Sequence, residues 1–225
     1  NIAGAVTAVN YTQNGGTLGG AGNLTVSGAA SLGSAVGTGT TMTGAGTTRF
    51  NGALAIIGSG VHDFSGGRSV VIAGPTTWTN AAGNEGQLRL GFNVTLENQG
   101  LWQDNTTVNT SINSNLGGGT FINSATGTYR KNGANTVSVS TGFTNNGAID
   151  LLGGTLALSG GGTLNGSFNV ATGTTLQFGG GSFALNSTAL SGNGRLLVSG
   201  GTVNQSGVLS LAAGASMELS GGTFN

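Results

Sequence analysis

The chain has 225 residues, of which 47 are Gly, one is Pro and none is Cys, and six basic and six acidic side chains leave it without net charge. So few basic residues exclude nucleic-acid binding, which needs clustered Lys and Arg, and the lack of Cys excludes disulfides and Cys-based metal sites. No apolar run reaches the roughly 18 residues of a transmembrane helix. Disordered chains usually combine low hydrophobicity with high net charge, so a neutral chain with 36% apolar residues is expected to bury a core.

Residues 1–75 carry short strand and turn patterns with only a weak repeat. The opening stretch, NIAGAVTAVN, lacks the basic and apolar regions of a signal peptide. Its continuation, YTQNGG, contains strand and turn residues and no amphipathic helix. We expect short strands in this part too, with coil boundaries that are harder to place than those further along the chain.

From residue 76 onward, an Asn that follows a small and an apolar residue returns about every 21 residues. These positions are Asn80, Asn98, Asn123, Asn145, Asn165, Asn186, Asn204 and Asn225. The phrase GGT followed by an apolar residue also recurs, and the chain closes on it as SGGTFN. A stack of equivalent coils accounts for such repetition, whereas a sandwich of β-hairpins has no reason to repeat whole phrases.

The stretches between these Asn residues alternate apolar and polar side chains, as in TLALS, TLQFG, SFALN, VLSLA and SMELS. Alternation with a period of two, ended after a few residues by Gly, predicts short β-strands, and no helical pattern is present. We expect the following side chains to point inward: Leu156, Leu158, Leu176, Phe178, Leu196, Val198, Leu209, Leu211 and Leu219.

These patterns predict an all-β fold, a parallel β-helix (β-solenoid) of roughly ten coils of about 21 residues, with two or three strands per coil. Residues 1–225 are expected to form one such domain, as a segment of a longer chain or as a fibre subunit. A sandwich of β-hairpins is the main alternative, because alternation and frequent turns suit it as well.

The repeated Asn has two interpretations. A buried amide at the same turn of each coil can donate to one neighbouring coil and accept from the other, which builds a ladder. Alternatively, these residues only tolerate left-handed turns, as Asn146-Gly147 and Asn165-Gly166 suggest.

One group of charged residues follows the coil spacing closely enough to be a candidate surface binding patch. Arg49, Arg68 and Arg89 lie about one coil apart, as do Asp63 and Glu85. Together with His62 they could form a sugar-binding or catalytic face, because β-helical polysaccharide enzymes cluster acids on adjacent coils. The alternative is a solvated stripe of ion pairs on a neutral rod.

The two Trp residues have different expected positions. Trp78 precedes Asn80 as Phe121 precedes Asn123, which indicates the core, whereas Trp102 lies in the more polar GLWQDN and is the better candidate for an exposed sugar-stacking residue. A single His and no Cys make a transition-metal site improbable, and no cofactor is indicated.

The stretches FTNNGAIDLLGGTLALSGGGTLNGSF, VATGTTLQFGGGSFAL and GNGRLLVSGGTVNQSG resemble repeats of large bacterial surface and secreted proteins. These are the autotransporter passengers and the filamentous-haemagglutinin-like exoproteins. The resemblance covers residues 115–225 through its motifs and the remainder through composition. It implies a right-handed parallel β-helix, an extracellular or cell-surface location, and a role as adhesin, stalk or matrix component. No catalytic residue carries over, because the repeat has none.

Three functions follow from these observations. The first is an adhesin or stalk without catalysis, with a carbohydrate or host-surface ligand. The second is a fibre subunit that associates end to end, because neither terminus offers a cap for the open strand edges of a solenoid. The third is a carbohydrate-active enzyme that uses the region of Asp63 and Glu85.

Overall fold

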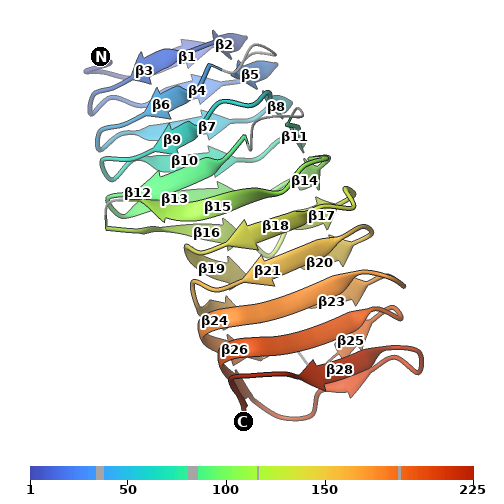
Figure 1. Cartoon of the computed structure of the whole chain (residues 1–225). Coiled ribbons are helices and arrows are strands. Elements are labelled where there is room, and N and C mark those ends of the chain that lie inside the picture. Colours follow the sequence, from blue (N-terminus) through green and yellow to red (C-terminus); the bar gives the residue numbers. More distant parts are fainter. Residues whose placement is uncertain (34–37, 81–85, 116, 187–188) are drawn as a thin grey trace.

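The strands of the chain pair in parallel, one coil upon the next, and build the β-solenoid that the sequence predicts. The computed structural model describes residues 1–33, 38–80, 86–115, 117–186 and 189–225. Within these ranges the chain forms no helix and makes about nine turns of about 22 residues. Figure 1 shows the coils stacked in chain order from the N-terminus to the C-terminus. Some coils are longer than expected: Asn98 and Asn123, which contact each other in adjacent coils, are 25 residues apart.

Each coil contributes strands to three columns that run along the stack. The first column contains β3 (Gly16–Leu18), β6 (Thr40–Met42), β9 (His62–Phe64), β12 (Leu88–Gly91), β15 (Thr110–Asn115), β18 (Thr136–Val139), β21 (Thr155–Leu158) and β28 (Ser216–Leu219). The second column contains β1 (Val6–Ala8), β4 (Leu24–Val26), β7 (Thr47–Phe50), β10 (Ser69–Ile72), β13 (Val94–Asn98), β16 (Gly119–Asn123), β19 (Gly142–Asn145), β22 (Gly162–Leu164) and β29 (Thr223–Phe224). The third column contains β2 (Tyr11–Gln13), β5 (Ala30–Leu32), β8 (Leu54–Ile56), β11 (Thr76–Trp78), β14 (Leu101–Asp104), β17 (Thr128–Lys131), β20 (Ala148–Leu151), β23 (Ser167–Val170), β25 (Ala189–Ser191) and β27 (Ser210–Leu211).

Two long strands join the first and second columns. β24 (Thr175–Leu185) and β26 (Arg195–Gln205) run through the corner between them, with an irregular register around Gly179. Among the described residues, the first two columns therefore form one sheet of 19 strands, and the third column forms a separate sheet of 10. All of these pairings are parallel, which excludes the hairpin sandwich.

Alternate side chains of each strand enter one core that runs along the stack. In β21, Leu156 and Leu158 are buried while Thr155 and Ala157 are partly exposed. Six of the residues expected to point inward are buried: Leu156, Leu158, Leu176, Phe178, Leu196 and Val198. Burial of one such side chain is worth about 1.5–3 kcal/mol, so this repeated apolar stripe is the main source of stability.

The other three inward candidates lie in the last coils. Leu209 and Leu211 are partly buried against the core, whereas Leu219 is 56% exposed. Leu219 is in register with the buried Val198, so its side chain has the same orientation. It is exposed because no later coil among residues 1–225 covers it.

Three of the repeated Asn residues form a buried ladder at the ends of β13, β16 and β19. The Nδ2 atom of Asn98 donates to Oδ1 of Asn123, and Nδ2 of Asn123 donates to Oδ1 of Asn145, each at 2.8 Å. All three side chains are fully buried. The ladder stops at Asn145 because Leu164 takes the next position in register, and among the described residues Nδ2 of Asn145 has no hydrogen-bond partner.

The remaining repeated Asn residues lie elsewhere. Asn165 follows Leu164 and is exposed, where it links Asn146 to Asn186 in an outer row with donor–acceptor distances of 2.7 Å. Asn225 donates to Asn204 at 2.8 Å in a second exposed pair. Asn80 lies beyond β11 in the third column, where its side chain contacts the backbone of the next coil. The single Asn column expected from the sequence is thus several shorter rows, because the interval between these residues does not always match the coil length.

Candidate functional site

Asp63 of β9 and Arg89 of β12 face outward at the same position of neighbouring coils. Arg89 donates from Nε and Nη2 to the two carboxylate oxygens of Asp63, at 2.6 and 2.5 Å. These hydrogen bonds raise the pKa of Arg89. The Asp63 carboxylate is therefore engaged by a cation across the coil boundary.

Two further ion pairs link neighbouring coils along the stack. Arg130 contacts Asp150 at 2.9 Å, and Arg195 contacts Glu218 at 2.6 Å. Such exposed pairs each contribute about 0–1 kcal/mol to stability. The Arg130–Asp150 pair lies in the third column and the other two pairs lie in the first, so the three pairs do not form one stripe.

His62 does not share this surface with Asp63, because consecutive residues of a strand face opposite sides. His62 is fully buried, and its Nδ1 lies 2.9 Å from Oγ1 of Thr40 in the preceding coil. Burial lowers the pKa of His62 to about 4, so the ring is neutral near pH 7. It cannot act with Asp63 on a surface ligand.

Arg68 is also fully buried, at the corner before β10. Its guanidinium donates to the carbonyl oxygen of Thr43 at 3.0 Å, to Oγ1 of Thr48 at 2.9 Å and to the carbonyl oxygen of Gly20 at 2.7 Å. Burial lowers the pKa of Arg68. Arg68 thus satisfies oxygen atoms of the two preceding coils and is a structural residue.

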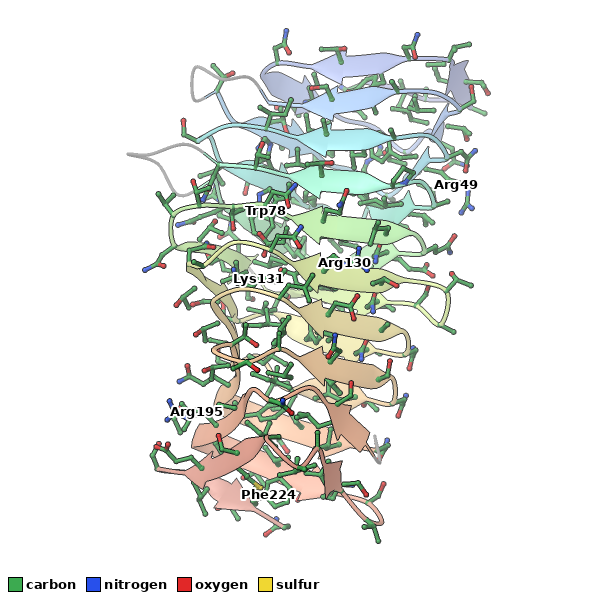
Figure 2. The ribbon with its side chains drawn as sticks, turned by 90° about the vertical axis from the view of Figure 1, so that its right-hand side faces the viewer. Arg49, Trp78, Arg130, Lys131, Arg195 and Phe224 are labelled. Atoms are coloured by element: carbon green, nitrogen blue, oxygen red, sulfur yellow. The ribbon has the colours of Figure 1, made fainter. Side chains whose placement is uncertain are left out.

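Arg49 and Glu85 complete the charged part of the candidate patch. Arg49 faces outward from β7 and donates to Asn51 at 2.8 Å and to Gln99 at 3.2 Å, and Figure 2 shows it at the margin of the stack. Glu85 lies outside the described residues. The structure therefore brings together only Asp63 and Arg89 of the predicted patch.

Trp102 is fully buried, so the expectation of an exposed Trp102 is wrong. The alternation in β14 directs Trp102 and Asp104 inward and Gln103 outward. The Trp102 ring packs edge-on against Phe121 at a centroid distance of 5.4 Å and stacks on Tyr129 at 6.3 Å. Of the polar neighbours that suggested exposure, Asp104 belongs to a buried polar cluster.

This cluster, which we call the Asp104 cluster, consists of Asp104, Thr106, Tyr129, Lys131 and Asn135. Oδ2 of Asp104 accepts a hydrogen bond from the Tyr129 hydroxyl at 2.8 Å. Its Oδ1 accepts from the Thr106 hydroxyl at 2.6 Å and from the Thr106 backbone N–H at 3.1 Å. Lys131 lies in register with Asp104 on the next coil, and its Nζ donates to Oδ1 of Asn135 at 2.9 Å. Asp104 and Lys131 are fully buried, which is rare for charged side chains.

Burial shapes the acid–base properties of this cluster. It raises the pKa of Tyr129 well above the ordinary value, and the neighbouring Asp104 charge adds to the increase. Burial also lowers the pKa of Lys131, although the Asp104 charge acts in the opposite direction. The Lys131 amine is therefore easier to deprotonate than an exposed one.

A surface depression of about 210 Å³ lies beside this cluster and is lined by Asn109, Thr110, Ser111 and Ser138. Asn109 also accepts a hydrogen bond from the backbone N–H of Thr136. The hydroxyl and amide groups here can hydrogen-bond a polar ligand.

The turn between β12 and β13 exposes an aromatic residue in an unusual conformation. Phe92 and Asn93 have φ angles of 54° and 60°, in the left-handed region. At the same corner the later coils use Gly, such as Gly181 and Gly201 with φ of 69° and 68°. Phe92 is 51% exposed, so burial of its ring does little to offset the strain of this backbone conformation. An exposed aromatic ring beside an amide is a suitable contact for a sugar or a protein surface.

No known protein-family model matches the chain, and neither the curated proteins nor the solved structures contain a significant match. In the described ranges no group of three or more His, Asp or Glu side chains could hold a metal ion. The same ranges contain no helix of a length and apolarity that would cross a membrane. Geometry thus defines the chain as a β-solenoid repeat protein.

Proposed function

We propose that the chain is an extracellular structural or adhesive β-solenoid of a bacterial surface or secreted protein, and that it acts as a stalk or adhesin without catalysis. The supporting observation is that the outward polar side chains of several strands are either paired with an opposite charge or uncharged. Asp63, Asp150 and Glu218 each pair with an Arg of a neighbouring coil. Small polar residues such as Thr144 and Thr163 occupy equivalent outward positions. A surface of this kind suits a neutral, rigid rod that contacts other surfaces.

A screen of the purified chain against neutral and acidic polysaccharides tests this proposal. Immobilised chain should retain a polysaccharide or a host-cell surface, and the soluble products should show no turnover. An Asp63→Asn variant is the matched control, because it removes the anionic charge of the acid of the predicted patch that lies within the described residues. Turnover that is present in the parent and absent in Asp63→Asn would replace the adhesive role with an enzymatic one.

A second function, a filament subunit that associates end to end, is favoured by the last coil. Met217 and Leu219 are 39% and 56% exposed, although Leu196 and Val198, with which they are in register, are buried. We propose that the first coil of a second copy covers them. The strands β1, β2 and β3 of that coil belong to the second, third and first columns, so they could pair with the last strand of each column. This contact is heterologous and therefore propagates. Sedimentation should show concentration-dependent association, and a monomer at all concentrations would contradict it.

A further inference from the structure

The Asp104 cluster brings together the fully buried Lys131 amine, the fully buried Asp104 carboxylate and the partly buried Asn135 carboxamide. Lys131 lies at the end of β17 and Asn135 lies four residues later, just before β18, so the turn between them folds the amine back onto the amide. Nζ of Lys131 donates to Oδ1 of Asn135 at 2.9 Å and to the carbonyl oxygen of Gly133 at 2.7 Å. The nitrogen is thereby held next to the carbon that carries this amide oxygen.

The amide of Asn135 is fixed on its other side as well. Its Nδ2 donates to Oγ1 of Thr106 at 3.0 Å and to the carbonyl oxygen of Val108 at 2.6 Å. The Thr106 hydroxyl in turn donates to Oδ1 of Asp104. A continuous hydrogen-bonded path therefore connects the Asp104 carboxylate to the nitrogen that would leave if the amide were attacked.

We propose that Lys131 and Asn135 join in an intramolecular isopeptide bond, with Asp104 and Thr106 as positioning residues that hold the attacked amide. Two observations support this proposal. The amine of the fully buried Lys131 donates a hydrogen bond to the Asn135 amide oxygen, and Thr106 links the nitrogen of that amide to the fully buried Asp104. A nucleophile that is held beside its electrophile in this way reacts as if at very high concentration.

The reaction balances without an oxidant or a further reactant. The Lys131 ammonium loses one proton to solvent, and the neutral amine attacks Cγ of Asn135. The Nζ–Cγ bond forms and the Cγ–Nδ2 bond breaks, while a second amine proton moves to the departing nitrogen. The ammonia that leaves takes up one proton from solvent and departs as ammonium. One amide replaces another, and the buried cation is removed.

The environment supports each step. Burial lowers the pKa of Lys131 and so eases the first proton transfer. The Tyr129 hydroxyl and the Thr106 backbone N–H hold the Asp104 carboxylate in place, and Tyr129 stacks on Trp102. Both rings are fully buried, so they keep the Asp104 carboxylate away from solvent.

Mass spectrometry of the folded chain tests the proposal. The intact mass should be lower than the sequence mass by one ammonia molecule, and trypsin should not cleave after Lys131, because its amine is acylated. A succinimide at any Asn-Gly pair, such as Asn132-Gly133, Asn146-Gly147 or Asn165-Gly166, would give the same loss of mass, but hydroxylamine cleaves a succinimide and leaves an isopeptide bond intact. The chain that has lost ammonia should therefore resist hydroxylamine, and an Asn132→Ala variant should retain the loss.

Two variants identify the reacting group and the positioning group. Lys131→Met removes the nucleophile at nearly constant length and should have the full sequence mass. Asp104→Asn removes the carboxylate that orients Thr106 and, through it, the amide, so a smaller fraction of this variant should lose ammonia. Circular dichroism of each variant shows whether the β-solenoid is kept. The proposal is overturned if the parent has the full mass, or if Lys131→Met still loses ammonia, because that result assigns the loss to the Asn-Gly succinimide.

Discussion

At the level of single residues, the left-handed turn at Phe92 and Asn93 shows a conflict between backbone and side chain. An L-residue in this region costs about 1 kcal/mol, which Gly avoids. Because Phe92 is half exposed, burial of its ring offsets only a small part of that cost. A residue that weakens the fold and presents an aromatic surface is a reasonable contact point for a ligand.

We predict that Phe92→Gly raises the free energy of unfolding by about 1 kcal/mol, because it removes the strain of the positive φ. The urea midpoint measures this change. Phe92→Ala is the control, since it removes the ring and keeps the Cβ atom that causes the strain, and its midpoint should not rise. If Phe92 contacts the ligand of an adhesin, both variants should bind it less. A lower midpoint for Phe92→Gly would show that the ring itself stabilises the turn.

The buried His62 predicts a specific dependence of stability on pH. Its pKa is about 4 in the folded chain and about 6.5 when unfolded, so the unfolded state takes up the proton first as the pH falls. The stabilisation is fully present above about pH 6.5 and is lost towards pH 4, at a cost of about 3 kcal/mol. His62→Gln, which can still accept from Thr40, should flatten the pH profile in this window. Parallel profiles for parent and variant would contradict it.

At the level of the strands, the buried Asn ladder depends on the register of β13, β16 and β19. Asn123 occupies the middle position, where it accepts from Asn98 and donates to Asn145. Asn145 accepts from Asn123, but Leu164 follows it in register. Loss of a rung therefore leaves a buried amide without a partner, which is costly in a dry interior.

We predict that Asn145→Ala lowers the free energy of unfolding by about 1–3 kcal/mol and that Asn123→Ala lowers it more, because Asn123 has ladder partners on both sides. Asn165→Ala is the matched control, since Asn165 belongs to an exposed row. Urea midpoints should fall in the order Asn165, Asn145, Asn123. Equal midpoints for the parent and Asn145→Ala would mean that the ladder contributes no stability.

The sequence predicts the strands well because alternation reports directly on which side chains are buried. TLALS and TLQFG each place two apolar residues inward, as Leu156 and Phe178 show. It does not predict the Asp104 cluster, because a charged residue in an alternating stretch is normally assigned to the outer face. The missed signal is register: Trp102 and Asp104 lie two residues apart, as do Tyr129 and Lys131 in the next coil. An aromatic residue and a charged residue at these spacings must share the same face.

The structure places His62 and Arg68 in the interior, and the sequence pattern missed this for a related reason. Spacing by one coil places residues in the same part of the stack, but it does not say whether they face inward or outward. His62 and Asp63 are adjacent and face opposite sides, and Arg68 lies at a corner where it binds backbone oxygens. Among the patch residues that the structure describes, Asp63 and Arg89 alone share both the position and the outward direction.

At the level of the whole molecule, a solenoid gains stability from contacts between neighbouring coils, so a coil covered on one side only is weaker than an internal one. The last coil shows this directly. Val198 is fully buried beneath β28, whereas Leu219, in register with it, is 56% exposed. The same position thus changes from core to surface over one coil, and a further coil from a second copy would restore the core.

We predict that Leu219→Lys abolishes end-to-end association, because a second copy would then have to bury a charge in place of an apolar side chain. Leu152→Lys is the matched control: Leu152 has a similar exposure, 49%, but lies in the middle of the stack, so this variant should associate like the parent. Sedimentation velocity over a range of concentrations measures the association. Loss of association in both variants would indicate a lateral contact between rods, and association retained in Leu219→Lys would show that the last coil is not the interface.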